Sequence, residues 1–331
     1  MNAQARRAAL FLLLAPGPLA EVLSGNVPLL TFLQPVPFLL VTVSYGVPVL
    51  LIRELAVARG LNVAGVVLLG LAYGILNEGV LAKTLTQPDG PPLEAFAGYG
   101  RIGELQGGWT VFILFWHALH SVLYPILLCR WVFPAAADRR WFANGRARWL
   151  LYGLILILAG LYALHFLNPL RNDPGTFVLY AATTAALVGI GLRFGRTPAT
   201  VSASAPATRS LTPALLGGGA VLFYVAQFAS PTRIPFAVFL AASVAAIAMA
   251  AVVMLRARWR PVPELLLFGL GDYLTFASFS ALVHVIAGRD ALQAAAAGAI
   301  FAGLFAGLVR AVMRRPAGRN VAPESTPGSS T

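Results

Sequence analysis

Three side chains capable of acid–base chemistry lie at matched depths in two consecutive apolar stretches. Glu78 lies near the end of one stretch, and His117 and His120 lie near the start of the next. At a helical rise of 1.5 Å per residue, Glu78 lies about 10 Å below the outer end of its stretch. His117 lies about 12 Å and His120 about 16 Å below the outer end of theirs. Ser121 follows His117 at i+4, so it shares a helix face with both histidines. We therefore expect Glu78 to meet His117 or His120.

A carboxylate with two imidazoles supports three kinds of chemistry. The group could bind a divalent metal, with Glu78, His117 and His120 as ligands. It could act as general base and acid on a substrate from the outer leaflet. It could also relay protons in a transporter, since an ionisable group in hydrocarbon costs about 2.5–3.5 kcal/mol and is seldom kept without a role. The fourth interpretation is a buried glutamate–histidine pair that only holds two helices together.

Other polar residues also fall within or beside apolar stretches. Asn77 stands beside the glutamate, and Lys83 ends the same stretch. Asp272 lies in a later stretch, about 12 Å from the cytoplasmic side, where it could bind a cation or pair with an arginine of a nearby loop. Glu21 and His284 lie near the outer ends of their stretches, and each is interpreted as an interfacial or hydrogen-bonded residue.

The composition places these residues in a membrane protein. The chain has 331 residues, of which 58% are hydrophobic and 11% are charged, whereas soluble domains are about 45–50% apolar and about 25% charged. The net charge of +12 resides in arginines within short gaps between apolar runs, and these form no continuous basic stripe. That pattern excludes a nucleic-acid partner and favours retention of positive charge on the cytoplasmic side. The partners we expect are membrane lipids.

Ten apolar stretches are long enough to be considered as membrane spans, which need about 20 residues. They cover residues 8–24, 35–52, 62–84, 109–132, 149–167, 176–194, 213–230, 234–255, 264–287 and 291–312. With the N-terminus inside, the cytoplasmic segments hold 19 of the 24 basic residues. We therefore predict an all-α, polytopic transmembrane helix bundle of about ten spans in the cell (inner) membrane. Both termini lie in the cytoplasm, and Pro16 and Pro18 break the first helix.

The organisation of the chain follows from this map. Residues 1–315 form the transmembrane domain, and residues 195–212 are rich in Ser, Thr, Ala and Pro. This segment is predicted to be a flexible linker between two halves, 1–194 and 213–315. Residues 316–331 are predicted to be a disordered cytoplasmic tail. Residues 85–108 form the one long outside loop, whose length is typical of a functional segment such as a lid.

Glycines predict where helices approach one another. Gly70 and Gly74 form one GxxxG pair and Gly303 and Gly307 another, and both pairs predict close helix contacts.

Residues 73–134 carry a motif that can be compared with known families. Gly74 precedes Asn77-Glu78-Gly79, as in a Gly-x-x-(Glu/Asn)-Glu-Gly motif. A Pro-containing loop comes next, Trp109 opens the following span, and His117 to Ser121 form a His…Ser helix. In these features the segment resembles an uncharacterised family of multi-pass bacterial and archaeal membrane proteins.

A weaker likeness is to CAAX-type intramembrane proteases. Those proteins use paired glutamates followed by an arginine, with histidines on the next helices. Here Asn77 stands in place of the first glutamate, and Lys83 lies one position beyond the family's basic residue. The likeness implies chemistry centred on Glu78, without the second carboxylate of that family's motif.

Three functions compete on these observations. The first is an intramembrane enzyme that acts on a lipid or lipid-linked substrate from the outer leaflet, through Glu78, His117 and His120. The second is a proton-coupled secondary transporter with two five-helix halves, in which Gly46 and Pro48 would interrupt one helix and residues 217–219 its counterpart. The third is a membrane assembly or structural partner without turnover. The position of the polar cluster on one side of the membrane favours the enzyme.

Overall fold

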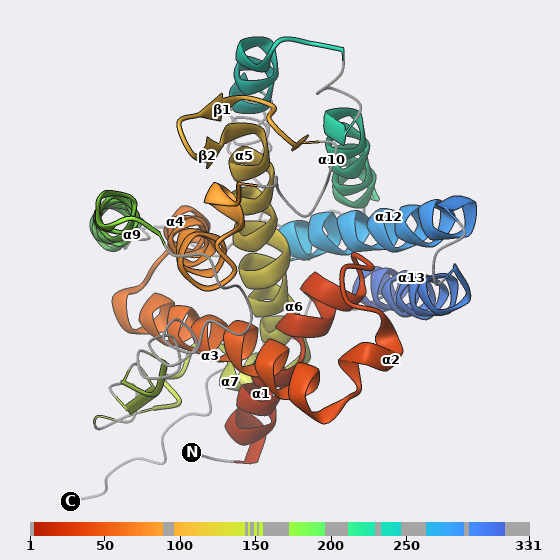
Figure 1. Ribbon diagram of the computed structural model, residues 1–331. Helices are drawn as coiled ribbons and strands as arrows, with labels where there is room; N and C mark the ends of the chain where they lie inside the picture. The colour runs from red at the N-terminus through yellow and green to blue at the C-terminus, as the bar shows by residue number, and fades with distance from the viewer. Residues whose placement is uncertain are drawn as a thin grey trace, which may run out of the picture.

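The computed structural model describes residues 3–88, 96–142, 145, 149–150, 152–154, 172–195, 211–228, 233–245, 263–287 and 291–314 (Figure 1). The α-helices are α1 (Ala3–Leu14), α2 (Leu29–Phe32), α3 (Pro35–Arg59), α4 (Val63–Ile75), α5 (Gly107–Trp116), α6 (Tyr124–Val132), α7 (Pro134–Ala137), α9 (Pro174–Phe194), α10 (Thr212–Phe228), α12 (Pro263–Ala287) and α13 (Ala291–Arg314). Three π-helical segments are η1 (Pro18–Val22), η2 (Leu76–Leu81) and η5 (His117–Leu123), and η3 (Thr84–Thr86) is a 3-10 turn. Strands β1 (Arg101–Ile102) and β2 (Leu105–Gln106) pair antiparallel, with Arg101 opposite Gln106.

The predicted helical fold is confirmed. Six helices in the described ranges are long and apolar enough to cross a membrane: Pro35–Arg59, Val63–Leu81, Gly107–Val132, Pro174–Phe194, Pro263–Leu282 and Leu292–Arg314. Two shorter apolar helices cover Thr212–Leu222 and Phe236–Ala245. Most of the predicted 149–167 span, of the 195–212 linker and of the second half of the 234–255 span lies outside the described residues, as does the 316–331 tail.

The first helix is broken where its prolines predict a break. Helix α1 ends at Leu14, and the π-helical η1 begins at Pro18 and carries Glu21. Proline cannot continue the hydrogen-bond ladder of the preceding turn, so the chain changes direction at this point. Neither piece alone is long enough to span a membrane.

A continuous helix formed by α5, η5 and α6 runs through the centre of the molecule (Figure 1). Helix α4 packs against η5 on one side and against α9 on the other. Helix α12 packs against α10, α13 and α6. The N-terminal α1 lies against α3 and α6. The segments η2 and η5, which carry the acid–base residues, therefore meet at the centre of the bundle.

The first GxxxG pair makes the close contact that was predicted. A Cβ atom at Gly70 would lie 2.7 Å from the Cα of Ala118, and one at Gly74 would lie 3.2 Å from the Cβ of His117. Any side chain at either position would push α4 away from η5. These glycines thus set the spacing between the helix of Glu78 and the helix of His117.

The second GxxxG pair makes no close contact with the residues that the structure describes. A Cβ at Gly303 or Gly307 would meet nothing within 4 Å in the described part of the chain. Helix α13 instead approaches α12 at Gly298, where a Cβ would lie 2.6 Å from the Cβ of Ala281. The spacing of the glycines was correct for a contact, but the helix presents a different face to its neighbour.

The predicted helix breaks at Gly46 and at residues 217–219 are wrong. Helix α3 continues through Gly46 and Pro48, and α10 continues through all three glycines. A Cβ at Gly46 would lie 2.1 Å from the carbonyl oxygen of Leu13, and one at Gly217 would lie 2.0 Å from that of Phe268. These glycines therefore permit close backbone approach and do not interrupt their helices.

Arg53 has a structural role beyond its place in the charge pattern. Its side chain is 3% exposed, forms an ion pair with Glu54, and stacks 3.5 Å from the ring centre of Trp141. Its guanidinium donates hydrogen bonds to the carbonyl oxygens of Ala136, Ala137 and Arg139. Glu54 in turn accepts hydrogen bonds from the backbone N–H groups of Trp141 and Phe142. This pair fixes the 136–142 turn against the end of α3.

Candidate functional site

The candidate acid–base residues lie on two facing π-helical segments. Asn77 and Glu78 belong to η2, and His117, His120 and Ser121 belong to η5. A π-helical turn inserts a residue into an α-helix, and such turns occur frequently at functional sites. Neither segment was predicted, because π-helical turns have no residue pattern comparable to a helix cap or a glycine pair.

Glu78 and His117 form a buried pair, as one of the two predicted pairings requires. The Nε2 of His117 lies 2.7 Å from the Oε1 of Glu78, and the two residues are 1% and 6% exposed. The hydroxyl of Thr84 donates to the other carboxylate oxygen. The indole N–H of Trp109 donates to Thr84 Oγ1 over 2.9 Å, which positions that hydroxyl.

The contacts of His117 with Glu78 and Ser121 fit a ring that carries its proton on Nε2, and the Nδ2 of Asn77 also lies 3.2 Å from that nitrogen. With its proton on Nε2, the ring donates to Glu78, and its Nδ1 accepts from the Ser121 hydroxyl at 3.2 Å. The Nδ2 of Asn77 lies 3.1 Å from Glu78 Oε1 and donates to it. The carboxylate thus accepts hydrogen bonds from Asn77, Thr84 and His117. This arrangement fixes its orientation and leaves about one acceptor position for a further donor.

His120 does not join Glu78, which corrects the expectation that both histidines share one site. Its Nε2 contacts Asp272 of α12, and its ring stacks on Trp116 with centroids 3.9 Å apart. The two histidines separate because η5 is π-helical. In a π-helix the hydrogen bonds join residues i and i+5, and the turn is wider than in an α-helix. The i+3 residue His120 is rotated away from His117, whereas the i+4 residue Ser121 stays beside it.

Asp272 has a partner that sequence reasoning did not consider. It is fully buried, and its carboxylate contacts His120. The glycine before it, Gly271, permits contact with α10, where a Cβ would lie 2.0 Å from the carbonyl oxygen of Ala214. The next residue, Tyr273, donates its hydroxyl to the carbonyl oxygen of His120 over 2.6 Å. The Asp272–His120 pair therefore fastens α12 to η5.

Lys83 and His284 are the two other predicted polar residues. Lys83 is 1% exposed and adopts a left-handed conformation, φ 58°, in the turn between η2 and η3. The side chain of His284, in α12, lies outside the described residues. Across the described ranges, no group of three or more His, Cys, Asp or Glu side chains is gathered in a way that could hold a metal ion. Glu78, His117 and His120 are thus divided between two pairs.

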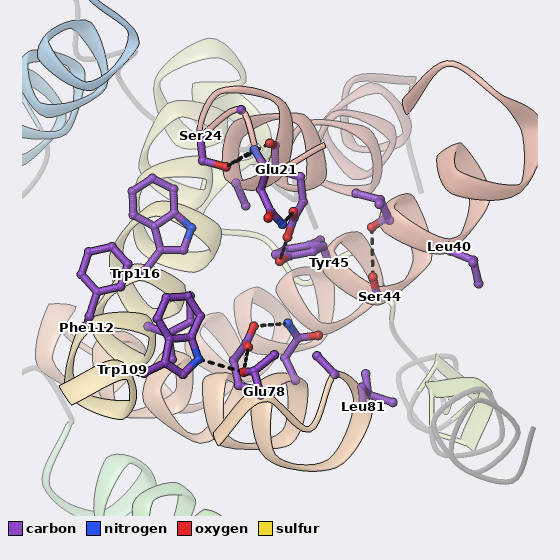
Figure 2. A pocket seen from close by; sticks show the side chains of 18 of the residues that line it. Glu21, Ser24, Leu40, Ser44, Tyr45, Glu78, Leu81, Trp109, Phe112 and Trp116 are labelled. Carbon is purple, nitrogen blue, oxygen red and sulfur yellow. Dashed lines mark hydrogen bonds between the residues drawn. The ribbon is translucent and has the colours of Figure 1, made fainter. Parts of the chain in front are cut away.

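A cavity of about 1030 Å³ opens beside Glu78 (Figure 2). Its wall is mostly apolar and aromatic, and His117 lies behind Glu78, outside the lining. The polar and aromatic lining residues include Glu21, Ser24, Asn26, Ser44, Tyr45, Asn77, Glu78, Thr84, Trp109, Phe112, Trp116, Phe276, Phe279 and Ser280. The Asp272–His120 pair does not line this cavity. Of the two carboxylate–imidazole pairs, only Glu78–His117 can reach a bound molecule.

Glu21 is a second carboxylate of the cavity, and sequence reasoning missed it by interpreting it as an isolated interfacial residue. The hydroxyl of Tyr45 donates to one of its oxygens and the side-chain amide of Asn26 to the other. The Tyr45 ring also stacks on His117, with centroids 5.7 Å apart and planes at 24°. Tyr45 thereby connects the two acidic sides of the cavity (Figure 2). The proline break before Glu21 was the one available signal, since it turns the chain.

The described end of the long loop, residues 96–106, packs onto the start of α5. Phe96 is fully buried and stacks on Phe112, with centroids 5.5 Å apart. Tyr99 donates its hydroxyl to the carbonyl oxygen of Ile234 over 3.0 Å, and burial raises the pKa of this hydroxyl above its ordinary 10.0. The loop thus contacts one cavity wall through Phe112, and its role as a lid stays a prediction.

A bundle of long apolar helices around a largely apolar cavity that holds two carboxylates defines a multi-pass helical membrane protein. The chain belongs to an uncharacterized membrane protein family, whose model matches residues 9–327. This match confirms the family resemblance found in the sequence and extends it over nearly the whole chain. No curated protein and no solved structure matches the chain. Membership of this family names no activity, so the site itself must carry the functional argument.

Proposed function

We propose that this protein is an intramembrane enzyme that performs acid–base chemistry on a lipid or lipid-linked substrate from the outer leaflet. One observation carries the proposal: the carboxylate of Glu78 lines a largely apolar cavity of about 1030 Å³ and is held from behind by His117. An oriented carboxylate–imidazole pair in an apolar pocket is the usual arrangement of a general base. The pocket walls suit an acyl or isoprenoid chain.

Each residue has a distinct role in this proposal. Glu78 takes a proton from the substrate or returns one to it. His117 is a positioning residue, because it contacts Glu78 and is covered from the cavity. Ser121 fixes the His117 ring through Nδ1, and Thr84 fixes the second carboxylate oxygen. No metal is needed for these roles, although an ion could still bind Glu78 together with groups of the substrate.

Glu78→Gln tests the proposal, because it removes the base and leaves the size of the side chain nearly unchanged. A host strain that lacks the gene is complemented with wild type or variant, and the membrane lipids are compared by mass spectrometry. We expect Glu78→Gln to reproduce the lipid profile of the strain without the gene. If the variant restores the wild-type profile while folding normally, the catalytic role of Glu78 is excluded.

The second buried pair supplies a matched control. Asp272→Asn also replaces a buried carboxylate next to an imidazole, but this pair does not line the cavity. We expect this variant to reduce the folded yield, measured by size-exclusion chromatography, while the folded fraction restores the lipid profile. An effect of Glu78→Gln on folded yield alone, like that of Asp272→Asn, would favour the third function, an assembly or structural partner.

A proton-coupled transporter is the second candidate, and one observation favours it. The histidines of the two carboxylate–imidazole pairs, His117 and His120, both lie on η5, and their partners Glu78 and Asp272 lie on η2 and α12. Such a series of titratable groups is typical of proton pathways. Proton flux in vesicles that contain the purified protein, lost in both Glu78→Gln and Asp272→Asn, would select this function over the enzyme.

The topology that we propose has ten spans with both termini in the cytoplasm, in the cell (inner) membrane. The partition of 19 against 5 basic residues supports it. So do the six long and two shorter apolar helices of the described ranges. Accessibility labelling of single cysteines, introduced after Cys129 is replaced, tests this topology at residues 104 and 205. Residue 104 should react from outside and residue 205 only after permeabilisation.

A further inference from the structure

The charges that line the cavity all have the same sign. Glu21 and Glu78 are its only ionisable side chains besides Tyr45, and no lysine or arginine lines it within the described chain. The two donors to Glu21, the Tyr45 hydroxyl and the Asn26 amide, are both neutral. The histidine partner of Glu78 does not line the cavity. A ligand that brings positive charge would therefore compensate the cost of two carboxylates in an apolar cavity.

The remaining lining residues fit an organic cation better than a metal ion. Aromatic side chains of Tyr45, Trp109 and Trp116 face the cavity (Figure 2), and the face of an aromatic ring attracts an ammonium group. The volume of about 1030 Å³ far exceeds that of a metal ion, and the described residues offer no cluster of three metal-binding side chains.

Hydrogen bonding distinguishes a primary ammonium from a quaternary one. Each oxygen of Glu21 already accepts one hydrogen bond, and a carboxylate has about four acceptor positions. Two positions therefore remain, and Ser24 and Ser44 also line the cavity. A primary ammonium has three N–H donors and can use them, whereas a quaternary ammonium has none.

We propose that the cavity binds the primary ammonium headgroup of a lipid, and that Glu21 is the residue that selects it. The apolar walls take the lipid chains, and the ammonium lies between Glu21 and the aromatic rings. This inference names the class of substrate for the proposed function. It rests on that function in one respect, that the cavity beside Glu78 is the binding site. Binding can be measured without turnover, so each of the two can fail without the other.

The test compares how tightly three probes bind to the purified full-length protein in detergent. Native mass spectrometry measures the binding of each probe. The probes are dioctanoyl phosphatidylethanolamine, dioctanoyl phosphatidylglycerol and soluble glycerophosphoethanolamine. We expect the ethanolamine lipid to bind at least about tenfold more tightly than the glycerol lipid, the ratio that one charge-assisted contact supplies. The soluble headgroup should bind weakly, because it has no chains to bury.

Glu21→Gln should remove the preference for the ethanolamine lipid. Glu104→Gln should keep it, because Glu104 is an exposed carboxylate of the β-hairpin loop. Equal binding of the two lipids to the wild-type protein overturns the inference, even if Glu21→Gln fails to fold. Tight binding of the soluble headgroup excludes a lipid. A loss of headgroup preference in Glu104→Gln as well would show that the site is not at Glu21.

Discussion

Replacing Gly46 with alanine tests whether this glycine bends α3 or permits close packing, because the two roles predict opposite signs. In the interior of an unhindered helix, alanine is about 0.8–1.0 kcal/mol more favourable than glycine. In this structure, however, the added Cβ would lie 2.1 Å from the carbonyl oxygen of Leu13, and its three nearest neighbours are all backbone atoms. Backbone atoms cannot rotate aside, so α1 must move away from α3.

The net effect follows from the two contributions. Overpacking costs about 1–3 kcal/mol, and a contact with rigid backbone belongs at the upper end of that range. After the gain in helix propensity, we expect a loss of about 2 kcal/mol. This corresponds to a decrease in Tm of about 4–8 °C on the scale of domains of 150–250 residues. The shift of α1 should also displace Glu21 from Tyr45 and weaken lipid binding.

The assay measures the melting temperature of the purified protein in detergent from the change in its intrinsic fluorescence. Gly189→Ala is the matched control, since Gly189 lies inside α9 and a Cβ there would meet nothing within 4 Å. We expect the control to leave Tm unchanged or raise it. An unchanged or higher Tm for Gly46→Ala would refute the packing argument and restore the possibility of a flexible helix.

Three further predictions concern stability. Arg53→Met removes the partner of buried Glu54 and should destabilise the protein by about 3 kcal/mol, measured as Tm. Asn62→Ala removes the side chain that accepts from Gly65 N–H at the start of α4 and should cost about 1 kcal/mol. The hydrogen bond from Thr176 lowers the pKa of Asp173 below its ordinary 3.8. The ionised Asp173 therefore stabilises the folded protein at pH values above 3.8. As pH falls through the lowered pKa, wild type should lose Tm relative to Asp173→Asn; parallel curves would contradict this.

The lengths of the apolar stretches and the charge pattern were sufficient to predict most of the described helices. The span predicted at 109–132 is a helix from Gly107 to Val132, and that predicted at 264–287 is α12, Pro263–Ala287. A span must be apolar along its whole length because it has lipid or other helices on every side, and this requirement is visible in any window of the sequence. The break at Pro16 and Pro18 was equally local, since proline acts on its own turn.

The depth argument was sufficient to pair Glu78 with a histidine but insufficient to choose which one. Depth depends only on the number of residues from a surface, whereas the direction of a side chain depends on the exact helical turn. The π-helical η5 rotates His120 toward Asp272 and keeps Ser121 beside His117. The choice between Gly298 and Gly303 at the contact of α12 with α13 has the same cause, because composition does not fix helix rotation.

The sequence by itself determined that the chain is a helical membrane protein and that Glu78 and His117 lie at one level, because length, hydropathy and charge act locally. Only the tertiary structure decided that Glu21, far from Glu78 in the chain, lines the same cavity. It also decided that the second histidine belongs to a separate pair. Both results depend on how non-adjacent helices cross and rotate, and that is set by contacts such as Gly46 with Leu13 and Gly70 with Ala118.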